Sequence, residues 1–149
     1  MLLILAAAVA LWYLSKTGTK GASLPSQGAQ QTTTNGLDNI TEAIARYEGF
    51  YTPGSVAQRT NNPGNIGTYG GNQTSYADSG DGWTALQSWV TSHAATHPDW
   101  SIAQMMTDYL TGSPTGTPGP KQNPAAYAGY VADYIGTTPD TPVLQVLQS

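Results

Sequence analysis

The chain contains two glutamates, Glu42 and Glu48, and their surroundings suggest different roles. Both lie in a stretch with apolar residues at helical spacing, which predicts a helix that begins near Leu37 and ends at Gly49. With Asn39 as the N-cap, Glu42 falls at position N3, where its carboxylate can accept a hydrogen bond from the cap N–H and meets the positive end of the helix dipole. We therefore interpret Glu42 as a structural residue.

Glu48 lies instead in the last turn of this helix, where a negative charge opposes the dipole by roughly 0.3–1 kcal/mol. It continues the row of Ile40 and Ile44 at a spacing of four, so its side chain should point along the inward face or its edge. Desolvation and the dipole should both raise the pKa of this carboxyl group. A carboxyl group that keeps its proton near neutral pH can donate it to a glycosidic oxygen. The alternative interpretation is a surface carboxylate at a frayed helix end.

A standard glycosidase needs a second carboxylate, as base or nucleophile, opposite the acid. The candidates are Asp78 and Asp81, which precede the apolar residues of another expected helix. Each also has a structural explanation as a turn or cap residue, and Asp81 before Gly82 suits that role in particular. Without such a partner, one glutamate could act first as acid and then as base. The 6-hydroxyl of the sugar would then attack and leave a 1,6-anhydro end.

The elements around these residues are predicted to be helical, apart from one small sheet. Helical spacing recurs in segments 83–90 and 102–110, on either side of the break at Pro98-Asp99. A hairpin is expected where short strands at 66–69 and 73–76 flank a Gly-Gly-Asn turn. Any sheet in this region should be small.

The C-terminal part contains two further predicted helices. Asn123 as N-cap and Pro124 in the first turn predict a helix that Gly136 ends, and residues 142–147 predict a short terminal helix. The fold class is therefore mainly α (α+β), with a small hairpin or irregular insertion after the helix of Glu48.

Several short motifs occur in an order that resembles phage lysozyme-like and lytic transglycosylase domains. In those domains, a glutamate at a helix end precedes an Asn-Asn-Pro-Gly-Asn-Ile loop, a short hairpin and an aromatic-led turn that opens the next helix. The similarity extends over roughly residues 38–147. The matching segments are Ala45–Phe50, Asn61–Ile66, Tyr76–Asp78, Asp81–Trp83, Asn123–Tyr127 and Gly136–Pro142.

The resemblance implies a lysozyme-like fold and an enzyme that cleaves the glycan strand of peptidoglycan between N-acetylmuramic acid and N-acetylglucosamine. By this resemblance Glu48 is the catalytic acid, and Asn62, Asn65 and Tyr127 are substrate-binding walls of the glycan cleft, with no cofactor. It leaves open whether the enzyme is a muramidase, which hydrolyses the bond, or a lytic transglycosylase, which takes the anhydro route. The alternative is a non-catalytic virion structural or wall-binding protein that retains the scaffold.

Charge and histidine spacing argue against two other kinds of site. The five basic residues are scattered and the formal net charge is −4, so no basic stripe is present to bind nucleic acid. His93 and His97 stand four residues apart and could face one metal ion, but neither a third ligand nor a His-Glu-x-x-His pattern accompanies them. We therefore expect an exposed helix face at these histidines and no metal.

The N-terminal region predicts membrane attachment. Residues 2–14 carry no charge and end in aromatic residues, which predicts a membrane-anchor helix over 1–16 that contacts the lipid membrane through residues 2–14. Residues 17–36 are rich in Gly, Ser, Thr and Gln and are expected to form a flexible linker, which leaves 37–149 as the catalytic domain. A cleaved signal peptide is the alternative to a retained anchor.

Membrane-containing bacteriophages pair a similar domain with a short apolar N-terminus. The resemblance thus implies a protein of the virion internal membrane that helps to penetrate the host cell wall, with other virion proteins as candidate partners. The bacterial inner membrane is the alternative location. The lysines after the apolar run would, by the positive-inside tendency, leave the domain inside the cell, so topology stays open.

Overall fold

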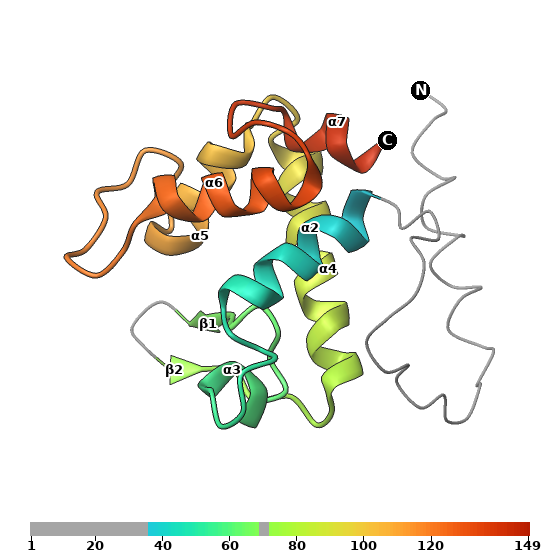
Figure 1. Cartoon of the computed structure of the whole chain (residues 1–149), viewed down its shortest axis with the longest axis vertical. Helices are drawn as coiled ribbons and strands as arrows, with labels where there is room; N and C mark the ends of the chain where they lie inside the picture. Colours follow the sequence, from blue (N-terminus) through green and yellow to red (C-terminus); the bar gives the residue numbers. More distant parts are fainter. Residues whose placement is uncertain (1–35, 69–71) are drawn as a thin grey trace. The chain divides into compact units, whose positions relative to one another are not determined.

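A computed structural model describes residues 36–68 and 72–149, and most of their regular structure is helical (Figure 1). Within these ranges one two-stranded antiparallel sheet pairs β1 (Gly67–Thr68) with β2 (Asn72–Gln73). The mainly helical fold class predicted from the sequence is confirmed. The helices are α2 (Gly36–Tyr47), α3 (Val56–Arg59), α4 (Ser79–Thr96), α5 (Ile102–Thr111), α6 (Pro124–Ile135) and α7 (Val143–Leu147).

Helix α2 packs against three of the other helices. Its apolar stripe buries Ile40 and Ile44, as predicted, and α4, α6 and α7 contact it. Gly36 lies so close to α7 that a Cβ on it would be 1.8 Å from the Val146 carbonyl oxygen. The first turn of α2 is thereby fixed against the C-terminal helix, and the other end of α2 leads directly into Glu48.

Side chains from α2, α4, α5, α6 and α7 form one hydrophobic core, and all the described residues belong to one compact unit. The chain has no cysteine, so the packing of these side chains must stabilise the fold without disulfides. The buried members of the core are Ile40, Ala43, Ile44, Leu86, Val90, Ala94, Ile102, Met105, Met106, Tyr127, Ala128, Val131, Ala132 and Val143.

Four of the helices, α3 to α6, begin at residues with capping side chains, which the sequence pattern indicated only in part. Asp78 is the N-cap of α4 and accepts a hydrogen bond from the Asp81 N–H at 3.0 Å, so Asp81 lies inside the first turn. Ser101 and Gln104 form a capping box at the start of α5 that we did not predict. Asn123 caps α6 as predicted and accepts a backbone N–H at 3.0 Å.

The predicted hairpin is confirmed, but its strands are two residues long rather than four. Gly136 has a φ of 75° and ends α6 in a left-handed conformation, and α7 lies within the predicted range of 142–147. The short helix α3 was not predicted. Ser55 caps it by accepting a hydrogen bond from the Gln58 N–H at 3.1 Å, a local signal that the surrounding glycines and prolines obscured.

The start of α2 differs from the prediction. The helix begins at Gly36, which the prediction placed in the linker, and Asn39 lies inside the helix, so the assignment of Asn39 as N-cap is wrong. Glu42 is therefore not at N3, and its carboxylate instead accepts a hydrogen bond from Arg46 Nε at 2.8 Å. The close approach of Gly36 to α7 explains why the helix begins before the local cap signal.

The predicted anchor at 1–16 and nearly all of the predicted linker at 17–36 lie outside the described residues. Among the residues that the structure does describe, no helix is both long and apolar enough to cross a bilayer. Lipid contact through residues 2–14 therefore stays a prediction.

Gly82 in α4 packs against the loop that precedes β1. A Cβ at this position would lie 1.9 Å from the Asn61 carbonyl oxygen and 2.8 Å from Pro63 Cδ, so Gly82→Ala must push helix and loop apart. We expect this substitution to lower the free energy of unfolding by about 1–3 kcal/mol. Gly129 in α6 has no other atom within 4 Å of such a Cβ, so Gly129→Ala should instead raise the free energy of unfolding by roughly 0.5–1 kcal/mol.

Urea denaturation of the full-length variants, monitored by circular dichroism, measures both changes in the free energy of unfolding. Equal stability of Gly82→Ala and the wild type would contradict the close packing of α4 on the loop.

Candidate active site

The end of α2 fixes the backbone at Glu48. The Glu48 N–H still donates to the Ile44 carbonyl at 2.9 Å, whereas Gly49 turns into a left-handed conformation with a φ of 75°. The Phe50 N–H then donates back to the Ala45 carbonyl at 2.9 Å, which closes the helix in a Schellman-type turn. The Glu48 side chain is therefore held at a helix C-terminus, half-buried at the edge of the face that packs inward.

Asn62 is fully buried and holds the loop that faces Glu48. Its Nδ2 donates to the carbonyl oxygens of Ile66 at 2.8 Å and Thr74 at 3.0 Å, and its Oδ1 accepts from the Ile66 N–H at 2.9 Å. Both N–H groups and the oxygen of this amide are thus used within the protein. Asn62 was predicted as a wall of the cleft, but it closes the base of the hairpin and shapes the loop.

The same loop contains two asparagines in left-handed backbone conformations. Asn61 has a φ of 53° and Asn65 a φ of 50°, and within the described residues no other non-glycine residue has a positive φ. Asparagine tolerates this conformation better than most residues, and such positions often occur at functional sites. Asn65 Nδ2 donates to Glu48 Oε2 at 3.2 Å, so the structure brings the predicted residues Asn65 and Glu48 together.

Burial raises the pKa of the Glu48 carboxyl group above its ordinary value. The Tyr127 hydroxyl and the Asn65 amide favour the ionised form and oppose this rise, but burial dominates. The raised pKa that we predicted for Glu48 is confirmed. Such a carboxyl group retains its proton to a higher pH than an ordinary glutamate does, which is the property that a general acid needs.

Two polar atoms beside Glu48 are buried without a hydrogen-bond partner among the described residues: Asn65 Oδ1 and the Tyr127 hydroxyl oxygen. The hydroxyl is near enough to Glu48 to lower its pKa, but it does not reach ordinary hydrogen-bond geometry with it. The Tyr127 side chain is fully buried, so it supports the carboxyl group from within rather than forming an exposed cleft wall. Because buried polar atoms are normally paired, these two atoms mark the surroundings of Glu48 as the candidate active site.

Tyr109 in α5 was not predicted as a site residue, yet it contacts two parts of the site. Its hydroxyl donates to the Gly64 carbonyl oxygen, and its ring meets the Tyr127 ring edge-on with centroids 5.8 Å apart. Burial, and then the charge of Glu48, raise the pKa of its hydroxyl, so it remains a donor. From the sequence, helical spacing predicted only that Tyr109 is a core residue. Its bond to Gly64 could not be predicted, because the two residues are far apart in the chain. Tyr109 therefore positions the loop that carries Asn65.

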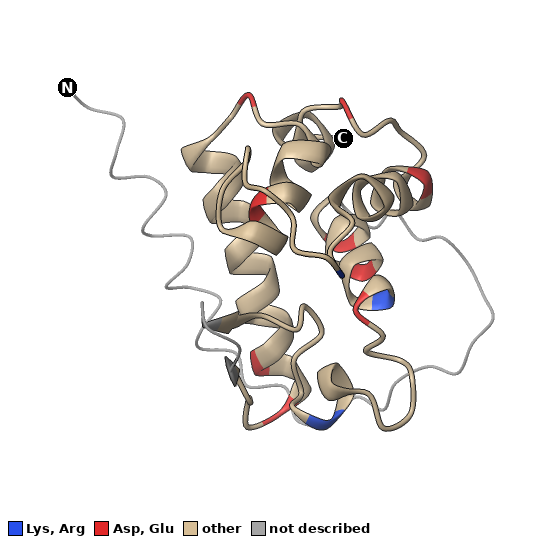
Figure 2. Cartoon of the chain, turned by 90° about the vertical axis from the view of Figure 1, so that its left-hand side faces the viewer, with Lys and Arg blue, Asp and Glu red and all other residues tan. Residues whose placement is uncertain are grey.

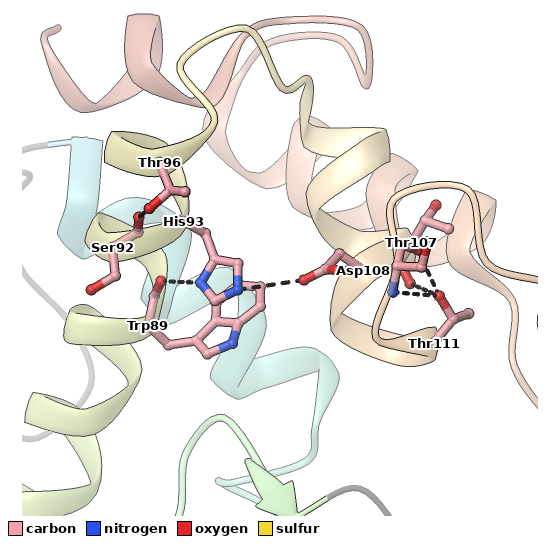
Figure 3. Close-up of polar contacts among 8 residues, drawn as sticks. Trp89, Ser92, His93, Thr96, Thr107, Asp108 and Thr111 are labelled. Atoms are coloured by element: carbon pink, nitrogen blue, oxygen red, sulfur yellow. Dashed lines mark hydrogen bonds and ion pairs between the residues drawn. The ribbon is translucent and has the colours of Figure 1, made fainter.

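His93 and Asp108 connect α4 to α5 next to Tyr109 (Figure 3). His93 Nδ1 lies 2.8 Å from the Trp89 carbonyl oxygen, and Nε2 lies 3.4 Å from Asp108 Oδ2. The imidazole stacks on the Trp89 indole at 3.9 Å, and that indole meets the Tyr109 ring edge-on at 4.8 Å. The expectation of an exposed histidine face is wrong, because His93 and His97 are both half-buried and each stacks on a tryptophan.

Asp78 and Asp81, the predicted candidates for a second carboxylate, lie at the start of α4. Asp78 is used as the N-cap, and Asp81 is exposed in the first turn. Neither is hydrogen-bonded to Glu48 or contributes to the shift of its pKa. In the described part of the chain the acidic residues are spread over several elements (Figure 2). Glu48 is thus the one carboxyl group that the hydrogen bonds of the described residues place at the candidate site.

Comparisons of the chain with protein-family models, with curated proteins and with solved structures found no match. The expectation of a lysozyme-like fold therefore rests on the resemblance of sequence motifs alone. The function is inferred from those motifs together with the geometry around Glu48.

Removal of the Asn65 amide should raise the pKa of Glu48 further, because Nδ2 favours the ionised carboxylate. The chain labelled with ¹³C at the glutamate carboxyl carbon gives one resonance for each of its two glutamates, and Glu42→Gln assigns them. In a pH titration by NMR, we expect the Glu48 midpoint to move to higher pH in Asn65→Ala. Gln145→Ala on the exposed side of α7 is the control and should leave it unchanged. An unchanged midpoint in Asn65→Ala would contradict the role of the amide.

The burial of Glu48 should also make the stability of the wild type depend on pH. Because the pKa of Glu48 is raised in the folded state, its contribution is fully present below the unfolded pKa and is lost as pH rises through the folded pKa. Glu48→Gln removes the charge, so we expect its melting temperature at neutral pH to exceed that of the wild type by a few degrees. Scanning calorimetry should find that this gain shrinks in acid. A lower melting temperature for Glu48→Gln at neutral pH would contradict the prediction.

Proposed function

We propose that the chain is a peptidoglycan-degrading enzyme and that Glu48 is its catalytic acid. The observation that carries this proposal is the half-buried carboxyl group at a helix end, with a raised pKa and beside an unpartnered Asn65 oxygen. The motif resemblance supports the substrate, the bond between N-acetylmuramic acid and N-acetylglucosamine.

In the proposed reaction, protonated Glu48 gives its proton to the glycosidic oxygen while the bond from that oxygen to the anomeric carbon breaks. The bonding electrons leave with the oxygen, and positive charge develops on the muramic acid ring. The ionised carboxylate is then stabilised by Asn65 Nδ2 and the Tyr127 hydroxyl, which favour that form. Glu48 next takes a proton from the attacking hydroxyl, so the enzyme returns to its starting state.

The identity of the attacking hydroxyl separates two products. Attack by water would give a hydrolysed end and would ordinarily use a second carboxylate. Attack by the 6-hydroxyl of the same muramic acid would give a 1,6-anhydro end, with Glu48 as both acid and base. Asp78 is used as the cap of α4 and neither it nor Asp81 is hydrogen-bonded to Glu48, so the motif resemblance is what favours the anhydro route of lytic transglycosylases.

We further propose that residues 2–14 anchor the enzyme in the internal membrane of a virion, with the bacterial inner membrane as the alternative. Attachment would confine the active site close to the wall and raise its effective concentration there. The competing function is a virion structural or wall-binding protein that holds glycan without cutting it. Activity of the isolated protein distinguishes the two.

The full-length chain in mild detergent should release soluble muropeptides from purified peptidoglycan. We expect Glu48→Gln to slow release by about 10²–10⁴-fold, because it removes the proton that the leaving oxygen needs. Asp140→Asn, which removes an exposed carboxylate in the loop before α7, is the matched control and should keep the wild-type rate. Mass spectrometry should find terminal muramic acid lighter by one water than the hydrolysed product.

A folded wild type that binds peptidoglycan without cutting it would favour the structural role. Products one water heavier than the anhydro form would retain the enzyme but replace the transglycosylase route by hydrolysis.

A further inference from the structure

The exposed aromatic residues of the described chain gather on one face. Tyr47, Tyr51, Tyr130 and Tyr134 are 40%, 51%, 39% and 43% exposed, and the only other large hydrophobic residue that is exposed there is Val56, at 39%. Large exposed apolar side chains that cluster on a soluble domain usually mark an interaction site. We call these four tyrosines the tyrosine face.

Ring contacts make the tyrosine face continuous. The centroids of the Tyr47 and Tyr130 rings are 5.4 Å apart, and those of Tyr130 and Tyr134 are 6.5 Å apart with an interplanar angle of 23°. The Arg46 guanidinium lies 5.6 Å from the Tyr134 centroid and 5.2 Å from the Tyr51 centroid, so it links these two rings. The face therefore extends from the C-terminal end of α2 along α6.

Glu42 holds two side chains of this region, those of Arg46 and Tyr51, in place. Arg46 Nε donates to Glu42 Oε1 at 2.8 Å, and the Tyr51 hydroxyl donates to Glu42 Oε2 at 2.7 Å. A rigid aromatic surface loses little side-chain entropy on binding, which favours affinity. The same pairing neutralises the charge of Arg46, so the face offers rings and hydroxyl groups rather than net charge.

The tyrosine face begins at the candidate active site. Tyr47 precedes Glu48 in the chain, and its ring stacks on that of buried Tyr127 with centroids 3.8 Å apart. Tyr127 in turn lies against the Glu48 carboxyl group. A polymer bound at Glu48 therefore has an aromatic surface adjoining the position where it is cut.

We propose that the tyrosine face binds the peptidoglycan glycan strand beyond the sugars that occupy the active site, an inference that rests on the proposed function. Tyrosine rings can pack against the apolar C–H faces of pyranose rings while their hydroxyls hydrogen-bond to the sugar hydroxyls. A neutral face of this kind suits an uncharged, hydroxyl-rich polymer better than an acidic or basic protein. Long strands should therefore gain affinity from contacts that short glycans cannot reach.

A binding assay in the Glu48→Gln background, in which the glycan should not be cut, tests this inference. Full-length Glu48→Gln is mixed with insoluble purified peptidoglycan, and the bound fraction is measured by sedimentation. We expect Tyr130→Ala with Tyr134→Ala, added to this background, to weaken binding about tenfold, and the same pair changed to Phe to retain most of it because the rings remain. Val56→Ala is the matched control, since it removes an exposed apolar side chain outside the tyrosine face. Equal melting temperatures establish that the variants are folded.

A second measurement uses active protein with intact Glu48. The double Ala variant should cut a tetrasaccharide of alternating N-acetylglucosamine and N-acetylmuramic acid at the wild-type rate, but should release muropeptides from insoluble peptidoglycan more slowly. Slow cutting of both substrates would overturn the assignment of the tyrosine face to the distant part of the strand.

The remaining outcomes separate this inference from the proposed function. If the double Ala variant binds peptidoglycan as tightly as its Glu48→Gln parent, the inference is wrong even where the wild type is active. If binding falls but the wild type never cuts, the tyrosine face binds glycan in a non-enzymatic protein, and only the proposed function fails. If the double Ala variant keeps its binding to peptidoglycan but loses binding to phosphatidylglycerol vesicles, the face binds a membrane instead. If it loses self-association in ultracentrifugation, the face binds a second copy of the chain.

Discussion

The burial of the Glu48 carboxyl group is the constraint on which the rest of the site depends. A carboxylate at a helix C-terminus opposes the helix dipole, and partial removal from water penalises its charge further. Among the described residues, no cation forms an ion pair with it. The surrounding structure offers one amide N–H from Asn65 and the Tyr127 hydroxyl, which is too little to offset the effect of burial on the pKa. A polar group held at this cost is characteristic of a site selected for chemistry rather than for stability.

The loop that carries Asn65 is held on three sides by elements distant in the sequence. Helix α4 contacts it through Gly82, α5 contributes the Tyr109 hydroxyl, and the base of the hairpin is joined to it through Asn62. Tyr109 follows Asp108, the residue that pairs with His93 on α4. The α4–α5 contact and the loop are therefore positioned by consecutive residues of one helix. The geometry of the candidate active site thus depends on core packing as much as on the loop itself.

The sequence predicted what local patterns can encode. Apolar spacing located the core helices, the Asn-Pro start and glycine end located α6, and a charge placed against the dipole singled out Glu48. Helix α3 and the capping box of α5 were missed although their signals are local, but three other failures each involved a partner distant in the chain. Gly36 begins α2 early because α7 lies beside it, and His93 is covered because α5 lies opposite. The hydrogen bond from Tyr109 to Gly64 joins residues 45 positions apart, and no periodicity in the sequence predicts it.

The two bonds from Asn62 Nδ2, to the carbonyls of Ile66 and Thr74, separate the active-site loop from the turn of the hairpin. Residues added between Thr68 and Asn72 would lie outside this closed base. The length of that turn can then vary while the backbone that positions Asn65 stays the same. Designs of this protein can therefore change the hairpin between its two strands without changing the candidate active site.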